Sequence, residues 1–185
     1  MEYASLFETD LGAGIVVATA AGICRVSLPY SDAISDPDLF GLTSSELSER
    51  VANMLINYFK GKPQPFENVP LDMNVSGSFR SHVLELVRTI SFGDIRSYAQ
   101  IACMAGSPGA ARAVGGAMAA NPVPVIVPCH RVVAADGGLT GFSAPGGLEL
   151  KKYLLKLEGV EFKGEHSIRK INVINRQTWH RNNIE

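Results

Sequence analysis

The feature that most constrains this chain is a proline-rich segment at residues 121–132, which reads NPVPVIVPCHRV. Its prolines are Pro122, Pro124 and Pro128. Each proline fixes the φ angle and lacks a backbone N–H donor, so neither a helix interior nor a central strand accommodates three of them. The segment therefore predicts a stiff, extended loop that presents one cysteine, Cys129.

Cys129 is the leading candidate for a nucleophile in this sequence. A histidine and an arginine, His130 and Arg131, follow it directly. Nearby positive charge stabilises a thiolate, which is the reactive form of cysteine. The alternative is a buried free cysteine that packs as a small hydrophobic residue. The rigid proline frame and the two basic neighbours favour the nucleophile.

Length and composition indicate a globular protein without a membrane span. The 185 residues are enough for one large domain or two small ones, and 46% of them are hydrophobic. No apolar run reaches the length of about eighteen residues that a bilayer requires. The first thirty residues carry acidic side chains instead of a basic start and an apolar core. We therefore expect no transmembrane helix, no signal peptide and a cytoplasmic location.

The three cysteines argue against disulfides and metals. Cys24, Cys103 and Cys129 are widely spaced, and no two of them form a CxxC pair. An odd number at such spacing predicts neither a disulfide framework nor a cysteine-rich zinc site. Cys24 lies in an apolar strand pattern and Cys103 in a helical one, so both are interpreted as packing residues.

Charge is distributed unevenly along the chain. Residues 1–76 contain ten acidic and four basic side chains, a net charge of −6, whereas the whole chain carries −1. The remainder is therefore +5, a balance that suits an anionic partner such as nucleic acid. An uneven scatter of surface charge would give the same numbers, and charge alone leaves both interpretations open.

The first 76 residues predict a small sheet with one helix. Val- and Ile-rich stretches at 14–19 and 22–28 form a hairpin pattern. Thr43 and Glu46 have the spacing of a capping box, which predicts the start of an amphipathic helix. The helix is expected to cover the sheet.

The segment after this helix predicts a strand and a domain boundary. A return strand is expected at 65–75, at a sheet edge because Pro70 cannot donate to a ladder. The Ser-Gly-Ser cluster at 76–78 is a linker candidate. A second domain is predicted at 77–162, and residues 163–185 form a basic tail.

Two short helices in the second domain form a helix-turn-helix pattern. They are preceded by a helix with apolar positions spaced over 79–90. The first of the pair spans 97–106 and the second 107–121, where Ser107 is the expected N-cap.

The second helix of the pair consists almost entirely of Ala and Gly, with one basic side chain, Arg112. Major-groove reading relies on Arg, Lys, Asn and Gln side chains. A smooth helix can instead approach a narrow minor groove, where a lone arginine could occupy the space of a displaced base. The alternative is a helix that packs on a neighbour while Arg112 forms a surface salt bridge. The helix alone does not decide between them.

A glycine-rich loop and a final helix complete the second domain. The loop at 141–147 combines glycines with Phe142 and Ser143, a composition suited to a small planar ligand or to a plain surface connection. The helix at 148–158 is expected to bury its leucines and to keep its lysines, Lys151 included, on the exposed face.

Three motifs together resemble the O6-alkylguanine-DNA alkyltransferases, also called methylated-DNA–protein-cysteine methyltransferases. They are PCHR at 128–131, ARAVGGAM at 111–118 and NPVP at 121–124. The likeness extends from about Gly77 to Val160, and the first 76 residues match only in outline. The resemblance implies a mixed α/β (α+β) fold, with a small ribonuclease-H-like domain of sheet and helix before a winged-helix-like helix-turn-helix domain.

The resemblance also implies a role for each candidate catalytic residue. Cys129 attacks the alkyl carbon, His130 acts as its base through a water molecule, and Glu158 orients the imidazole. Tyr98 donates a proton towards the departing guanine, and Asn121 ties the loop together. Without the resemblance, Tyr98 would be interpreted as a core aromatic and Asn121 as a helix C-cap.

DNA contacts and a substrate pocket are implied in the same way. Arg112 takes the place of the flipped base in the duplex. The small residues that allow close approach to the groove are Ala110, Ala111, Ala113 and Gly115. The guanine pocket is lined by Pro124, Val132 and Ser143. This chain departs from shorter family members in its pocket loop, where Ala144 and Pro145 are inserted.

The implied function is DNA repair by direct, irreversible transfer of an alkyl group to Cys129, with one turnover per chain. The expected substrates are O6-alkylguanine and O4-alkylthymine in double-stranded DNA, bound through the minor groove with the alkylated base flipped out. The chain is expected to act as a monomer without a cofactor or a metal. One alternative is a non-enzymatic binder of alkylated DNA, against which Cys129 argues. The other is a helix-turn-helix regulator, which the Ala- and Gly-rich helix disfavours.

Overall fold

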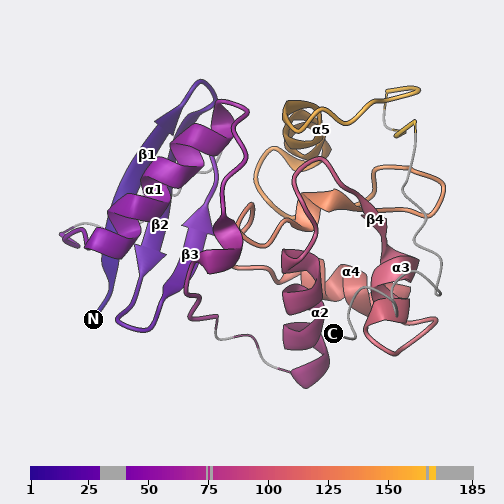
Figure 1. Ribbon diagram of the computed structural model, residues 1–185, viewed down its shortest axis with the longest axis horizontal. Helices are drawn as coiled ribbons and strands as arrows, with labels where there is room; N and C mark the ends of the chain where they lie inside the picture. Colours follow the sequence, from indigo (N-terminus) through magenta and orange to yellow (C-terminus); the bar gives the residue numbers. More distant parts are fainter. Residues whose placement is uncertain (30–40, 74, 76, 166, 170–185) are drawn as a thin grey trace.

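The computed structural model describes residues 1–29, 41–73, 75, 77–165 and 167–169. The chain has a mixed α/β fold in which a sheet with one helix lies beside a group of helices (Figure 1). The antiparallel sheet has the order β1 (Tyr3–Thr9), β2 (Gly12–Ala18) and β3 (Ile23–Ser27). The predicted hairpin is therefore confirmed as β2 and β3.

Strand β1 was not predicted from the sequence. Phe7 points into the core, whereas Leu6 is 59% exposed. Ser5 also faces inward, because its hydroxyl lies 2.8 Å from the Ser48 hydroxyl. An inward serine and an outward leucine hide the apolar alternation. Phe7 pairs with Gly14, where an added Cβ would lie 2.3 Å from the Phe7 ring, so this register requires glycine.

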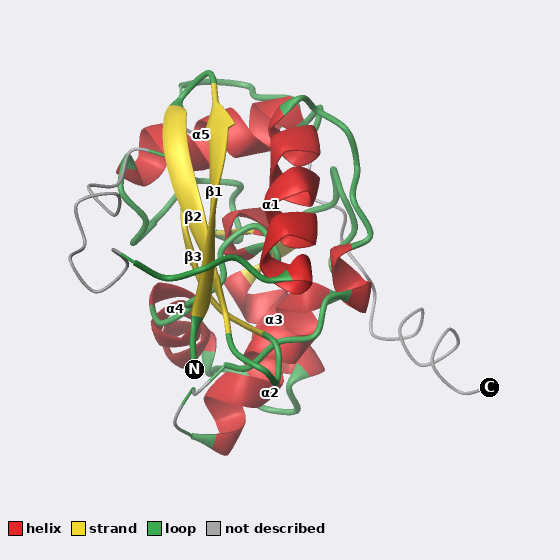
Figure 2. Ribbon diagram, turned by 90° about the vertical axis from the view of Figure 1, so that its left-hand side faces the viewer, coloured by secondary structure: helices red, strands yellow, loops and turns green. Residues whose placement is uncertain are grey.

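Helix α1 (Glu46–Phe59) lies along one face of the sheet (Figure 2). Its predicted cap at Thr43 is wrong, because the helix starts two residues later. The Ser45 hydroxyl accepts from the Ser48 N–H at 3.2 Å, and the Ser48 hydroxyl accepts from the Ser45 N–H at 2.9 Å. Two serines thus form the capping box. Val51 and Leu55 bury the apolar face.

The return strand predicted at 65–75 is also wrong. Phe66–Asn68 forms a 3-10 turn, η3, and only one bridge joins the described part of this segment to the sheet, from Leu71 to Ile23. The guanidinium of Arg88 stabilises the turn, because it donates to three carbonyls around it. Pro70 still contributes an acceptor, since the Ile23 N–H donates to its carbonyl at 2.9 Å.

The helices of the second half lie mostly where the sequence predicts them. They are α2 (Ser78–Arg88), α3 (Tyr98–Met104), α4 (Ala111–Ala119) and α5 (Gly147–Leu157). The predicted start of α4 is wrong, because residues 108–110 form a turn in which the Ala110 N–H donates to the Ser107 carbonyl at 3.0 Å. Between the helices, β4 (Arg96–Ser97) pairs in parallel with β5 (Val132–Val133).

One buried cluster runs through both halves of the chain. It joins Phe7 and Leu55 of the first half to Val87, Ile101 and Leu154 of the second. The backbone also connects the halves, since the Val26 N–H of β3 donates to the Pro122 carbonyl at 2.9 Å. The division predicted at residue 76 separates the sheet from the later helices and stays a prediction.

Two remaining predictions concern the ends of the chain. Most of the basic tail, residues 170–185, lies outside the described residues. Its first part folds back on the body, because the Ile168 N–H donates to the Gly137 carbonyl at 2.9 Å. Within the described ranges, no helix is long and apolar enough to cross a membrane.

Candidate active site

The loop that presents Cys129 is compact and turned, so the prediction of an extended segment is wrong. The Asn121 amide donates to the Val127 carbonyl at 2.8 Å, and its oxygen accepts from the Val123 N–H at 3.1 Å. Val125 adopts a φ of 73°, a strained conformation for a β-branched residue. Cys129 follows as the first residue of a 3-10 turn, η4 (Cys129–Arg131).

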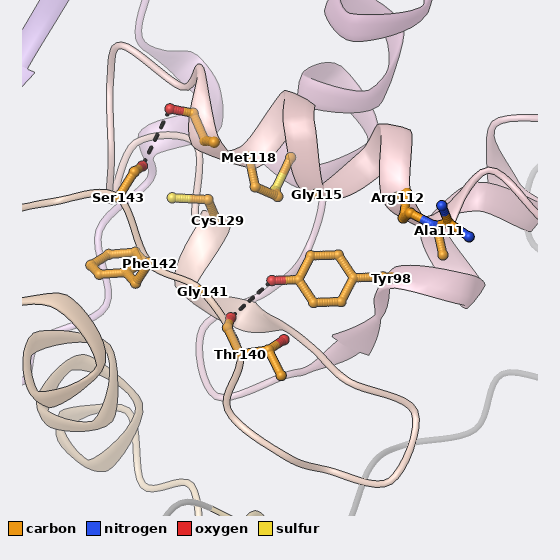
Figure 3. A pocket seen from close by; sticks show the side chains of 11 residues that line it. Tyr98, Ala111, Arg112, Gly115, Met118, Cys129, Thr140, Gly141, Phe142 and Ser143 are labelled. Carbon is orange, nitrogen blue, oxygen red and sulfur yellow. Dashed lines mark hydrogen bonds between the residues drawn. The ribbon is translucent and has the colours of Figure 1, made fainter.

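Two cavities meet at Cys129. The larger, of about 590 Å³, lies between α4, Tyr98 and residues 140–143 (Figure 3). The smaller, of about 260 Å³, extends from Cys129 towards residues 26–28 at the end of β3 and the Ala144-Pro145 insertion. Cys129 therefore borders both cavities, although the residue is only 6% exposed.

The thiol is not surrounded by the charges that the sequence suggested. Burial raises the pKa of Cys129, and the Asn121 amide and the Lys151 charge offset only part of this effect. His130 is buried, which lowers its pKa and favours the neutral imidazole. Arg131 donates to Glu158 instead. Burial therefore favours the protonated form of the thiol.

His130, the predicted base, forms a buried pair with Glu158. Its Nε2 lies 2.8 Å from Oε1 of Glu158, and both side chains are fully buried. Burial alone would raise the pKa of Glu158, but His130 and Arg131 hold it well below its usual range. Arg131 donates to both carboxylate oxygens at 2.9 Å. Nδ1 of His130 is buried without a hydrogen-bond partner in the described part of the chain.

Tyr58 is a member of this cluster that the sequence analysis missed. Its hydroxyl donates to Oε1 of Glu158 at 2.6 Å and lies 3.2 Å from Nε2 of His130. The available signal was its position three residues after Leu55, on the buried face of the helix. A buried tyrosine hydroxyl usually finds a hydrogen-bond partner, but the sequence does not indicate which one.

Lys151 was predicted to be exposed, and this prediction is wrong. The side chain is fully buried, and Nζ donates to the carbonyls of Val132 at 2.7 Å and Thr140 at 3.3 Å. Nζ also lies 5.8 Å from the centroid of the Tyr98 ring. Burial lowers the pKa of Lys151 to about 8. Helical periodicity cannot reveal this, because the partners are carbonyls of other segments.

Tyr98 and Ser143 both line the larger cavity (Figure 3). The Tyr98 hydroxyl donates to the Thr140 carbonyl at 3.1 Å, and the Ser143 hydroxyl donates to the Ala119 carbonyl at 3.3 Å. Both bonds hold residues 140–143 in place beside Cys129. Burial raises the pKa of Tyr98, so its hydroxyl keeps its proton.

The other predicted site residues divide between the cavities and their surroundings. Three line the larger cavity: Ala111, Arg112 and Gly115. Pro124 lines the smaller one. Three line neither cavity, since Val132 is fully buried, Ala110 packs against the core and Ala113 is exposed. Among the described residues, no group of three or more His, Cys, Asp or Glu side chains is placed to hold a metal ion.

The sequence of this chain is similar to a known family of proteins and to its members. A family described as the DNA-binding domain of 6-O-methylguanine DNA methyltransferase matches residues 78–160. A methylated-DNA–protein-cysteine methyltransferase of Methanosarcina acetivorans is 35% identical over 159 residues, which cover 85% of this chain and 98% of the relative. A constitutive methylated-DNA–protein-cysteine methyltransferase of Bacillus subtilis is 34% identical over 166 residues, with 88% and 99% covered.

Similarity extends to solved structures. Mycobacterium tuberculosis OGT in complex with DNA matches with a TM-score of 0.71 and 32% identity, over 85% of this chain and 93% of that chain. The two full-length relatives and this structure agree in family. The chain therefore belongs to the methylated-DNA–protein-cysteine methyltransferases.

Proposed function

We propose that the protein repairs DNA by transferring an alkyl group from O6-alkylguanine, and from O4-alkylthymine, to Cys129. The observation that carries this proposal is a buried thiol that borders two cavities and is followed by a histidine paired with a buried carboxylate. The names of the relatives and the complex of a similar protein with DNA support it. No cofactor or metal takes part in the proposed reaction.

In the proposed step, Sγ of Cys129 forms a bond to the alkyl carbon as the bond from that carbon to O6 breaks. The thiol proton passes through a water molecule to Nδ1 of His130, and Glu158 stabilises the imidazolium. Tyr98 donates a proton to the departing guanine, and the proton taken up by His130 then passes through solvent to the Tyr98 phenolate, which restores both side chains. The thioether is stable, so each chain acts once.

The two cavities suggest where the base and the alkyl group of the substrate lie. The larger cavity, bordered by Tyr98 and Ser143, suits a flipped base. The smaller one, bordered by Pro124 and Cys129, suits the substituent that the reacting carbon carries, while that carbon itself lies between O6 and the sulfur. Tyr98 must exchange its bond to the Thr140 carbonyl for one to the base. Of the three residues predicted to line the guanine pocket, Val132 would support the site only through its carbonyl, which binds Lys151.

Helix α4 is proposed to enter the minor groove, with Arg112 taking the place of the flipped base. Arg112 is exposed and borders the larger cavity. A Cβ added at Gly116 would meet nothing within 4 Å, and one at Gly115 only the Tyr98 ring at 4.0 Å. Glycine costs a helix about 1 kcal/mol relative to alanine. Since the folded protein does not require these glycines, close approach of DNA is a reason for them.

The finer architecture is proposed on the same basis. We assign the sheet and α1 to a ribonuclease-H-like domain at 1–76, and α2 to α5 to a winged-helix-like DNA-binding domain at 77–162. The short parallel pair of β4 and β5 adjoins this group of helices, because β4 ends where α3 begins. One chain is proposed to act on one lesion as a monomer.

The test is incubation of the protein with duplex DNA that contains one O6-methylguanine, followed by mass spectrometry of the peptide that carries Cys129. One methyl group in place of one hydrogen is expected, together with unmodified guanine in the DNA. Cys129→Ala should bind the duplex and accept no methyl group. An unchanged mass of the wild-type peptide would refute alkyl transfer, and binding without transfer would support the non-enzymatic alternative.

A further inference from the structure

Tyr58 connects the first half of the chain to the predicted catalytic pair. It lies on α1, is fully buried, and its hydroxyl contacts Glu158 and His130 at 2.6 and 3.2 Å. We propose that Tyr58 is a positioning residue that fixes the tautomer and orientation of His130 for deprotonation of Cys129. The inference rests on the proposed function, in which His130 is the base.

Hydrogen-bond directions carry the first step of the argument. An ionised carboxylate only accepts hydrogen bonds, so the single Tyr58 proton points to Oε1 of Glu158, 2.6 Å away. The hydroxyl oxygen keeps its lone pairs for the Nε2–H of His130. Glu158 accepts from the same N–H at 2.8 Å. Two acceptors therefore hold the imidazole proton on Nε2, and Nδ1 carries the free lone pair that a base requires.

Charge supports the same assignment. Burial and the Glu158 charge raise the pKa of Tyr58 well above its ordinary value, so the phenol stays protonated and remains a donor. Glu158 is kept ionised by its neighbours His130 and Arg131, although burial alone would oppose this. Neither acceptor of the Nε2–H can therefore supply a competing proton to His130.

The hydroxyl of Tyr58 can be removed without losing the packing of its ring. The Tyr58 ring makes edge contacts with Phe59, Phe66 and Phe92, with centroids 5.6, 6.0 and 6.1 Å apart. Phenylalanine would preserve these contacts. Glu158 would also keep donors from His130, Arg131 and the Gly93 N–H, the last at 3.1 Å. Tyr58→Phe thus removes one hydrogen-bonding group without emptying the site.

The expected change in His130 has a defined sign. The charged groups that act on it are Glu158, Arg131 and Lys151, and none of them is replaced in Tyr58→Phe. Without the Tyr58 hydroxyl, the carboxylate has one donor fewer and attracts the imidazolium more strongly. The pKa of His130 should therefore rise, and the acid limb of the reaction should move to higher pH. Because the His130 ring loses one contact that fixes its orientation, the reaction should also be slower at neutral pH.

The experiment compares Tyr58→Phe with the wild type and with Val51→Ala. Val51 is also buried on α1, so its truncation weakens the same helix without touching the hydroxyl. Two rates are measured from acid to alkaline pH: methyl transfer from duplex DNA containing O6-methylguanine, and alkylation of Cys129 by iodoacetamide, followed on the Cys129 peptide. Tyr58→Phe should lower both rates by about tenfold or more. It should also move the acid limb of both pH profiles to higher pH.

Controls separate positioning from stability and from the proposed function. Val51→Ala should lower the melting temperature and leave both pH profiles unchanged, and all three proteins should bind the duplex equally. Unaltered profiles in Tyr58→Phe, or the same shift in Val51→Ala, would overturn the inference. Iodoacetamide profiles that depend on Tyr58 in a protein without methyl transfer would refute the function and retain the role of Tyr58.

A spectroscopic measurement on the wild type tests the inference without any variant. Nitrogen-15 chemical shifts of the His130 ring distinguish the two neutral tautomers. A proton on Nε2 is expected, and a proton on Nδ1 would contradict the proposed arrangement even if Tyr58→Phe failed to fold.

Discussion

His130 Nε2 lies 2.8 Å from Glu158 Oε1, with both side chains withdrawn from solvent. The contact joins the loop that carries Cys129 to the C-cap residue of α5. Because Arg131 from the same loop binds the same carboxylate, the loop and the helix end are locked together. The thiol of Cys129 is presented from this fixed frame.

His130→Asn tests the base directly. Burial lowers the pKa of His130 below 6.5 and raises that of Cys129 above 9.0. The wild-type transfer rate should therefore fall only at acid pH, where His130 becomes protonated. Between pH 6.5 and 9.0 it should not change with pH. Without the imidazole, the rate at neutral pH should drop by about 100-fold or more. It should then rise with pH until the thiol ionises by itself. A level profile in the variant would contradict the role of His130.

Lys151→Met tests the buried ammonium group. The pKa of Lys151 is 10.5 in the unfolded chain and about 8 in the folded protein. Between these values the unfolded state binds more protons, so the wild type gains stability as pH rises. The unfolding free energy of the wild type minus that of Lys151→Met should increase by up to about 1.4 kcal/mol per pH unit in this window. Urea denaturation at pH 8, 9 and 10 measures it. A difference that is constant with pH would refute the burial.

Gly116→Ala separates folding from DNA binding. The added methyl group meets no protein atom within 4 Å, so it should stabilise α4 by up to about 1 kcal/mol. If α4 enters the minor groove, the same methyl group should weaken binding to duplex DNA. Thermal unfolding and a binding titration at one salt concentration give the two values. Stability and affinity that rise together would argue against this approach.

Ala144→Phe tests the proposed alkyl site. Ala144 borders the smaller cavity of about 260 Å³, whereas Tyr98 and Arg112 border the larger one. A phenyl ring there should slow transfer of a benzyl group by at least about tenfold and affect methyl transfer less. The methyl substrate is the internal control. Equal slowing of both would place the alkyl group elsewhere.

Local sequence determined the elements whose signals are local. The capping box at Ser97 and Gln100, which starts the helix predicted at 97–106, is one of them, because both partners lie within four residues. The helices of the second half and the hairpin of β2 and β3 follow from apolar spacing. The alternation in β1 failed as a signal because Ser5 is buried by a bond to Ser48, which lies 43 residues away.

Only the tertiary structure decided the chemistry around Cys129. The family resemblance implied that Cys129, His130 and Glu158 share one site, whereas the sequence assigned the charge near the thiol to His130 and Arg131 and placed Lys151 in solvent. In the folded chain, Arg131 binds Glu158 and Lys151 is buried. Tyr58 reaches the same carboxylate from 100 residues away. Burial and hydrogen bonds between distant segments set these protonation states, and no periodicity in the chain encodes them.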